Sequence, residues 1–260
     1  IDASTAGLLV ASLARVSTPS GEACPAEEAG VQPGDILTRL GSTELKEPGD
    51  FARALAMLDG SETGLTLVRD EKTLQLSVRP VQDTDGVWRL GLWLRASVSG
   101  LGTVTYYDPD TGEYGALGHG INDADTGVLL PIGGGSIARA EVDEVVRGER
   151  GRAGELHGSY NAAESIGTVD ANTPNGIFGT AEGFGGEPMP VAESDEIADG
   201  PAVIISDVSG GPAEYDVEIK RDGERLLVTV TDPELLKTTG GIVQGMSGSP
   251  IIQDGRLVGA

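Results

Sequence analysis

The chain is poor in cysteine, histidine, aromatic residues and positive charge. Its one cysteine, Cys24, excludes a disulfide within the chain, and the surrounding Glu-Ala-Cys-Pro fits neither zinc-ligand spacing nor a catalytic thiol. The 41 acidic against 18 basic residues give a formal charge of −23, which repels the phosphates of nucleic acids and anionic lipids. We therefore expect no nucleic acid partner, and favour a soluble acidic surface over the alternative that the acidity attracts a basic substrate segment.

Long apolar runs and metal-binding motifs are also lacking. No run reaches the roughly 18 apolar residues that a membrane-spanning helix needs. Because the chain starts at Ile1 without an initiator Met, we expect an upstream anchor or signal segment that is absent from this chain. The acidic stretches at residues 108–110 and 122–125 lack the complete pattern of a calcium loop, so we assign no metal and no cofactor.

What the chain has in abundance is glycine. Forty glycines separate short Val, Leu and Ile runs, which predicts a mostly β fold with some α-helix. A length of 260 residues favours two compact domains. A charged linker at residues 82–86 places the boundary between a domain of residues 1–84 and a domain of residues 85–260.

The N-terminal part has the order of elements of a peptide-binding module. A glycine-led strand begins at Gly7, and Ala-Gly-Val-Gln-Pro-Gly-Asp-Ile-Leu follows at residues 29–37. An amphipathic helix over residues 45–58 and a hairpin of residues 65–69 and 74–79 complete the set. This part resembles a PDZ domain of the bacterial protease-associated type. The resemblance implies that Gly7, Leu8, Leu9 and Val10 bind an extended peptide or a C-terminus. The alternative is that the same three apolar residues only form a core strand.

The C-terminal part contains a nucleophile motif. In Gly-Met-Ser-Gly-Ser-Pro, residues 245–250, small residues leave room for a substrate carbonyl beside Ser247. The N–H groups of Gly245 and Ser247 are the candidate oxyanion hole. A serine nucleophile needs a base, and the chain has only two histidines, His119 and His157. His119 lies between two glycines, so we predict that it is the base, and that His157 is structural or lies near the substrate.

Three motifs together resemble the SpoIVB peptidases, the stage IV sporulation protein B family. They are Gly-His-Gly-Ile at residues 118–121, Asn-Thr-x-x-Gly-Ile-Phe-Gly at residues 172–179, and Gly-Gly-Ile-Val-Gln-Gly-Met-Ser-Gly-Ser-Pro at residues 240–250. The resemblance implies a trypsin-like double β-barrel behind the PDZ domain and a triad of His119, Asp232 and Ser247. Spacing alone leaves Asp123 and Asp125 open as the acid, and only the resemblance selects Asp232.

The resemblance also implies a biological role. Such peptidases process themselves and cut the extracytoplasmic part of a membrane-bound sporulation regulator, which leads to activation of a late sigma factor. We therefore expect a signalling serine endopeptidase that acts on a protein or peptide in the intermembrane space around the forespore. The chain ends at Ala260, where the family continues, so we expect a shortened barrel. The competing hypothesis is a non-catalytic PDZ-type peptide-binding scaffold.

Overall fold

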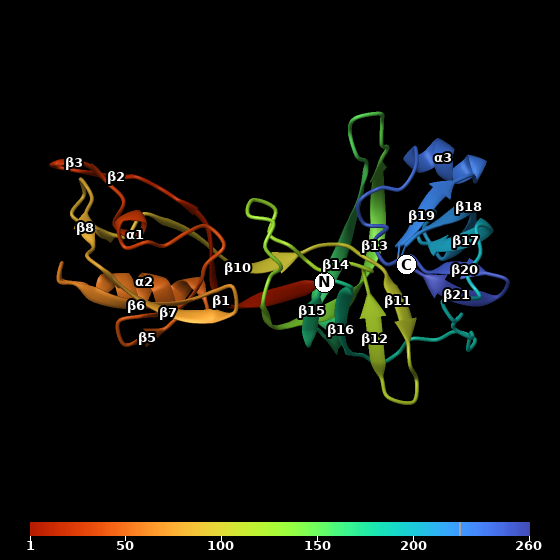
Figure 1. The fold of residues 1–260 in the computed structure, drawn as a ribbon, viewed down its shortest axis with the longest axis horizontal. Helices are drawn as coiled ribbons and strands as arrows, with labels where there is room; N and C mark the ends of the chain where they lie inside the picture. The colour runs from red at the N-terminus through yellow and green to blue at the C-terminus, as the bar shows by residue number, and fades with distance from the viewer. Residues whose placement is uncertain (224) are drawn as a thin grey trace. The chain divides into compact units, whose positions relative to one another are not determined.

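Strands dominate the structure, a computed structural model that describes residues 1–223 and 225–260 (Figure 1). Strands make up 51% of the residues and helices 8%, which confirms the predicted mostly β composition. The chain forms two compact units. The N-terminal unit consists of Ala3–Val98 and Asn122–Gly134, and the C-terminal unit consists of Ile1–Asp2, Ser99–Ile121 and Gly135–Ala260. The predicted boundary between residues 84 and 85 stays a prediction.

The N-terminal unit combines short strands with two helices. Its elements in chain order are β1 (Asp2–Leu13), β2 (Val16–Thr18), β3 (Gly21–Ala23), α1 (Pro25–Glu28), β4 (Ile36–Leu40), β5 (Thr43–Glu44), α2 (Pro48–Ala56), β6 (Thr63–Arg69), β7 (Lys72–Val78), β8 (Val81–Gln82), β9 (Trp88–Arg89) and β10 (Leu92–Ser99). Strand β1 pairs with β4 on one side, with Leu8 opposite Leu37, and it also pairs with β10. The sheet continues from β4 to β6 and β7.

Local chemistry explains two of these elements. Strands β6 and β7 form a hairpin whose two turn residues, Asp70 and Glu71, both have positive φ, as a two-residue turn between twisted strands requires. Helix α2 begins with Pro48 after Glu47, whose side chain forms a capping box with Asp50. The helix packs Phe51 and Leu55 against the core of the unit.

As far as the structure describes it, the C-terminal unit consists of twelve elements, of which one is a helix. Its elements are β11 (Val104–Tyr107), β12 (Glu113–Ala116), β13 (Ile132–Val146), β14 (Glu155–Thr168), β15 (Ala171–Thr173), β16 (Gly176–Thr180), β17 (Gly200–Ser206), β18 (Ala213–Asp222), β19 (Arg225–Val230), α3 (Pro233–Thr239), β20 (Ile251–Gln253) and β21 (Arg256–Gly259). Among the described residues, no helix in either unit is long and apolar enough to cross a membrane.

Two open sheets and a long hairpin organise this unit. One sheet has the strand order β11-β12-β16-β15, the other has the order β19-β18-β17-β20-β21, and β13 pairs with β14. Within the described part of the chain no sheet closes into a barrel, so the double β-barrel that the resemblance implied is not confirmed. The five-stranded sheet stays open because it ends at β19 and β21, which do not pair with each other.

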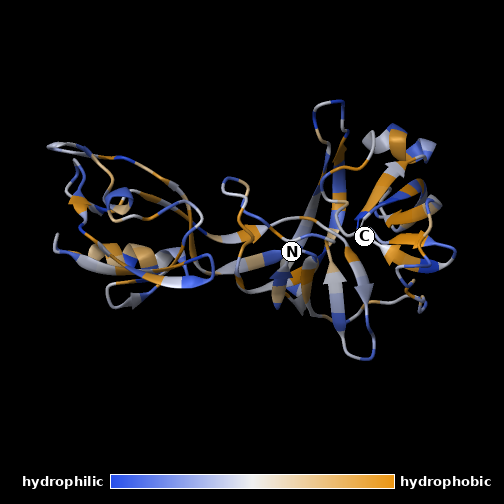
Figure 2. Cartoon of the chain, in the orientation of Figure 1, coloured by the Kyte–Doolittle hydropathy of each residue, from blue (hydrophilic) through white to orange (hydrophobic). Residues whose placement is uncertain are grey.

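The core of the C-terminal unit lies on the five-stranded sheet. Hydrophobic residues alternate along its strands, and Figure 2 shows them as orange segments on β17 to β20 and α3. The core includes Ile204, Val217 and Leu235, and also Met246 and Ile251, which flank the predicted nucleophile. Burial of Met246 next to Ser247 anchors the nucleophile turn to a packed core.

Candidate active site

Ser247 and His119 lie within hydrogen-bonding distance, although 128 residues separate them in the sequence. The Nε2 atom of His119 is 2.8 Å from the Oγ atom of Ser247. The other ring nitrogen, Nδ1, is 2.9 Å from the carbonyl oxygen of Gly120. A carbonyl oxygen can only accept a hydrogen bond, so Nδ1 carries the proton in the neutral ring. Nε2 is then the acceptor for the Ser247 hydroxyl, as a general base requires.

Backbone conformation directs His119 towards the serine. Leu117 and Gly118, which follow strand β12, both have left-handed φ angles of 73° and 69°. A left-handed conformation is unfavourable for leucine, and it is maintained here because the Leu117 side chain is buried. The chain therefore turns sharply after β12 and presents His119 at the surface.

The Ser247 turn requires its two glycines. Gly245 and Gly248 have φ angles of 96° and 88°. A Cβ atom at Gly248 would lie 2.2 Å from the carbonyl oxygen of Thr103, and one at Gly245 would lie 2.9 Å from Cβ of Leu156. Both positions therefore require glycine for two reasons. The backbone has a left-handed φ, and a Cβ atom would collide with a neighbouring segment of the chain.

Thr103 links the turn that carries Ser247 (the serine turn, residues 245–250) to the loop that carries His119 (the histidine loop, residues 117–121), and no sequence motif predicts this role. Its N–H donates to the carbonyl oxygen of Ser247 at 2.8 Å, and its carbonyl oxygen accepts from the N–H of Leu117 at 3.2 Å. Thr105 adds a side-chain hydrogen bond of 2.8 Å to the carbonyl oxygen of Gly248. These three hydrogen bonds fix the separation of the serine and the histidine. They depend on which backbone groups meet in space, and no residue pattern predicts that.

Asn172 holds the chain on the other side of His119. Its side-chain oxygen accepts from the N–H of Ile121 at 2.8 Å, and its side-chain NH₂ donates to the carbonyl oxygen of Ile121, also at 2.8 Å. The carboxamide thus pairs with the backbone as a neighbouring strand would. Asn172 opens a motif that was recognised in the sequence, but its role as a support for the histidine loop was not predicted.

The predicted oxyanion-hole groups are free to bind a substrate. In the described residues, the N–H groups of Gly245 and Ser247 donate to no protein acceptor. By contrast, the N–H groups of Met246 and Ser249 donate to the carbonyl oxygens of Val243 and Met246. The turn therefore leaves unpaired the two N–H groups that the sequence assigned to the oxyanion.

Asp232 does not contact His119 in this structure. It is the N-cap of α3, and its Oδ1 atom accepts from the N–H groups of Glu234 at 2.9 Å and Leu235 at 2.8 Å. Its Oδ2 atom accepts no hydrogen bond from any described residue. The structure thus brings together two members of the predicted triad, and it leaves one oxygen of the third unoccupied.

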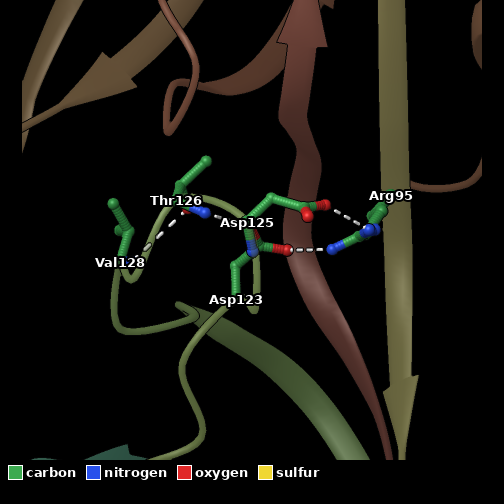
Figure 3. A network of polar contacts seen from close by, with 5 residues as sticks. All are labelled: Arg95, Asp123, Asp125, Thr126 and Val128. Atoms are coloured by element: carbon green, nitrogen blue, oxygen red, sulfur yellow. Dashed lines mark hydrogen bonds and ion pairs between the residues drawn. The ribbon is translucent and has the colours of Figure 1, made fainter.

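The aspartates nearest to His119 in sequence, Asp123 and Asp125, both pair with an arginine of the N-terminal unit. Asp123 and Asp125 lie in the N-terminal unit, where Arg95 of β10 extends towards both (Figure 3). Arg95 contacts the Oδ2 atoms of Asp123 at 2.6 Å and Asp125 at 2.5 Å. The Oδ1 atom of Asp123 accepts from the N–H groups of Asp125 and Thr126 and from the Thr126 hydroxyl.

Burial by itself raises the pKa of Asp123, but the hydrogen bonds from Thr126 and Arg95 outweigh burial and leave that pKa below its ordinary value. Asp123 is therefore an ionised structural group. Among the three candidates for the triad acid, it offers no free oxygen to a histidine.

The residues predicted to bind a peptide form a core strand instead. Leu8, Leu9 and Val10 have no exposed surface, and β1 is paired with both β4 and β10. A peptide adds to a free strand edge, and β1 already has two neighbours, so this pairing speaks against direct peptide addition at β1. Strand β10 pairs with β1 only, as far as the described residues go, and it lines a cavity of about 420 Å³ together with α2.

Comparison with known proteins agrees with this geometry. A family model described as SpoIVB peptidase S55 matches residues 86–260, and a PDZ domain model matches residues 16–69. No curated protein matches the chain. The peptidase match covers more than half of the chain and includes both His119 and Ser247. The chain is therefore a serine endopeptidase of the SpoIVB peptidase S55 family that carries a PDZ domain.

Proposed function

We propose that this enzyme cleaves a protein substrate with Ser247 as nucleophile, His119 as general base and Asp232 as the acid of the triad. The observation that carries the proposal is the 2.8 Å contact between Nε2 of His119 and Oγ of Ser247, together with the proton on Nδ1. As Oγ attacks the peptide carbonyl, Nε2 takes the hydroxyl proton. The same nitrogen then gives the proton to the departing amine.

The N–H groups of Gly245 and Ser247 stabilise the oxyanion that forms in the attack, since neither has a partner in the described structure. The carbonyl oxygen of Gly120 holds the histidine tautomer in the resting enzyme. We assign Asp232 as the acid because one of its oxygens is free and it lies in the same unit as His119. By contrast, Asp123 has no free oxygen, and both Asp123 and Asp125 pair with Arg95 in the N-terminal unit. The role of Asp232 is to stabilise the imidazolium when α3 or the histidine loop moves on substrate binding.

A fluorophosphonate probe tests the nucleophile. The probe should label the wild-type chain at Ser247 and leave Ser247→Ala unlabelled. Ser249→Ala is the matched control, because Ser249 belongs to the same turn but its buried Oγ atom has no hydrogen-bond partner among the described residues. Labelling of neither protein, with no cleavage of any peptide, would favour the scaffold hypothesis instead.

We also infer that the PDZ domain binds the C-terminus of a peptide in the cavity between α2 and β10. Phe51 and Leu55 of α2 and Trp93 of β10 line this cavity, and Trp93 is largely exposed. Arg15 lies at the same cavity and forms no ion pair with any described residue, so it is available to a terminal carboxylate. Quenching or enhancement of Trp fluorescence by a C-terminal peptide, lost in Arg15→Glu, tests this inference.

The family supports a sporulation role, and we propose that the substrates are this protein itself and the extracytoplasmic part of a membrane-bound sporulation regulator. We place the reaction in the space between the membranes around the forespore. The test is to incubate the enzyme with that extracytoplasmic part and to identify products by mass spectrometry. Cleavage by the wild type and none by Ser247→Ala supports the proposal, and intact regulator after cleavage of unrelated peptides would contradict it.

A further inference from the structure

A second cavity lies next to the serine turn in the C-terminal unit. It has a volume of about 420 Å³, and Gln244 and Gly245 form one wall. Leu101 and β14 from Glu155 to Gly158 also line it. Strand β14 is tied to this wall because the N–H of Leu156 donates to the carbonyl oxygen of Gln244 at 2.8 Å.

The position of this cavity relates it to one residue of the substrate. In the mechanism proposed above, the N–H of Gly245 binds the oxygen of the carbonyl that Ser247 attacks. The side chain on the amino side of that carbonyl is attached to the very next carbon atom, so it leaves the reaction centre close to Gly245. A cavity with Gly245 in its wall is therefore placed to receive that side chain.

The hairpin of β13 and β14 places the carboxylate of Glu155 in the lining of this cavity, and a second carboxylate, Glu144, next to the lining residue His157. Glu144 is directly opposite His157 in the antiparallel ladder, and Glu155 lies two residues before His157, so all three side chains share one face. Nε2 of His157 is 3.2 Å from Glu155, and Nδ1 is 3.8 Å from Glu144. No lysine or arginine is among the residues that line the cavity, within the part of the chain that the structure describes.

The remaining wall suits a long aliphatic chain. Leu101 is partly buried against the core of the unit and offers apolar surface. Gly158 keeps the space open, because a Cβ atom there would lie 3.1 Å from the Leu101 side chain and 2.3 Å from the carbonyl oxygen of Glu141. A lysine or arginine side chain combines an apolar stem with a charged end, which matches an apolar wall that has a carboxylate at its rim.

We propose that this cavity is the specificity site for a lysine or arginine on the amino side of the cleaved bond, with Glu155 as the residue that binds the positive charge. The proposal rests on the peptidase mechanism proposed above and adds the class of side chain that the enzyme selects. It also assigns a function to part of the acidic surface, since Glu155 lines the cavity and both Glu155 and Glu144 contact His157.

The test uses three peptides that differ only at the residue before the cleaved bond, which is lysine, its uncharged analogue norleucine, or glutamate. For the wild type we expect kcat/KM to be highest with lysine. Glu155→Gln should lower kcat/KM for the lysine peptide by about two- to fivefold, the range of a partly exposed ion pair, and leave the norleucine peptide unchanged. Glu155→Lys should make the glutamate peptide the better substrate.

Glu218→Gln is the matched control, because it removes the same charge from an exposed position on β18 that does not line the cavity. An equal ratio of lysine to norleucine turnover in the wild type and in Glu155→Gln would overturn the specificity site while leaving the peptidase proposal intact. A wild type that cleaves none of the three peptides and fails to react with a fluorophosphonate would overturn both.

Discussion

Two polar groups in the molecule differ in how many of their hydrogen-bonding atoms already have partners. One is the pair of His119 and Ser247, and the other is the cluster of Arg95, Asp123 and Asp125. His119 is exposed, Ser247 is half-buried, and one hydrogen bond joins them. In the cluster the groups are charged, and both oxygens of the buried Asp123 are occupied. Only the pair keeps a nucleophile oxygen that a substrate can reach.

The comparison shows why nearness in sequence misleads when a catalytic acid is sought. Asp123 is four residues from His119, yet its carboxylate stabilises a loop of the N-terminal unit. Asp232 is more than one hundred residues away, and it retains a free oxygen although it caps a helix. Available oxygen atoms, and not sequence distance, distinguish a candidate acid from a structural one.

The largest effect should come from removing the nucleophile. We expect Ser247→Ala to lower kcat by a factor on the order of 10⁶, because the remaining catalysis comes only from binding and the oxyanion hole. The fold should survive, since Ser247 is only partly buried and the change removes one oxygen atom. Peptide cleavage followed by mass spectrometry measures the loss, and full activity of the variant would remove Ser247 from the mechanism.

The next largest effect tests Asp232 against Asp123. If Asp232 is the triad acid, Asp232→Asn should lower turnover by a factor on the order of 10⁴, because an amide does not stabilise the imidazolium. Stability should change little, since asparagine is also a good N-cap and can accept the same two N–H groups. Asp123→Asn is the matched control for activity. A severe loss at Asp123 with normal turnover at Asp232 would reverse the assignment.

The sequence predicted the reactive side chains of the site, but it did not predict the residues that hold them in position. The Gly-Met-Ser-Gly-Ser-Pro motif predicted Ser247 as the nucleophile. The scarcity of histidine predicted His119 as its base, because a chain with two histidines offers few choices. Thr103 and the Nδ1 contact to Gly120 were not predictable, since they use backbone groups that every residue has. Asn172 belongs to a motif that the sequence analysis recognised, but the sequence did not indicate that its side chain would hydrogen-bond to Ile121.

The fold shows the same division between local and non-local information. The mostly β composition and the β6–β7 hairpin followed from glycine-rich turns and alternating residues. The predicted helix over residues 45–58 is shorter in the structure, at Pro48–Ala56, because proline and the capping box set its start. The use of β1 as an inner strand depends on β10, which comes more than eighty residues later, so local sequence left both the core-strand and the peptide-binding interpretation of Leu8 to Val10 open.

A smaller effect should follow from loosening the histidine loop. We expect Asn172→Ala to lower kcat by about ten- to a hundredfold, because Ile121 loses both hydrogen bonds and His119 is less well positioned. Asn172→Asp should rescue part of the loss, since it keeps the acceptor for the Ile121 N–H. Fluorophosphonate labelling rates report serine reactivity directly, and unchanged rates in both variants would show that Asn172 has no positioning role.

Disrupting the Arg95 cluster should alter stability and spare catalysis. We expect Asp123→Asn to lower the free energy of unfolding of the N-terminal unit by about 1–3 kcal/mol, because buried donors lose a charged acceptor. Trp88 and Trp93 both belong to this unit, so their fluorescence reports its unfolding in urea. A large fall in kcat with unchanged stability would contradict the division between the two regions.

The loss of stability caused by Asp123→Asn should depend on pH in a definite direction. The folded-state pKa of Asp123 lies below its ordinary value of 3.8, so its stabilising contribution is complete above about pH 4 and is lost as the pH falls through the folded-state pKa. The difference in unfolding free energy between the wild type and Asp123→Asn should therefore shrink on acidification. A difference that stays constant from pH 7 to pH 2 would show that ionisation of Asp123 is irrelevant.

The smallest effect should come from Asp125, the exposed member of the same cluster. Its side chain is 58% exposed, against 2% for Asp123, although both contact Arg95. Water already solvates an exposed carboxylate and salt screens its attraction, so Asp125→Asn should change the free energy of unfolding by no more than about 0.5 kcal/mol. Urea unfolding of both single variants and of the double variant separates the two contacts. If Asp125→Asn destabilised the unit as much as Asp123→Asn does, burial would not be what gives Asp123 its structural role, and the contrast with the open His119–Ser247 pair would have to rest on charge alone.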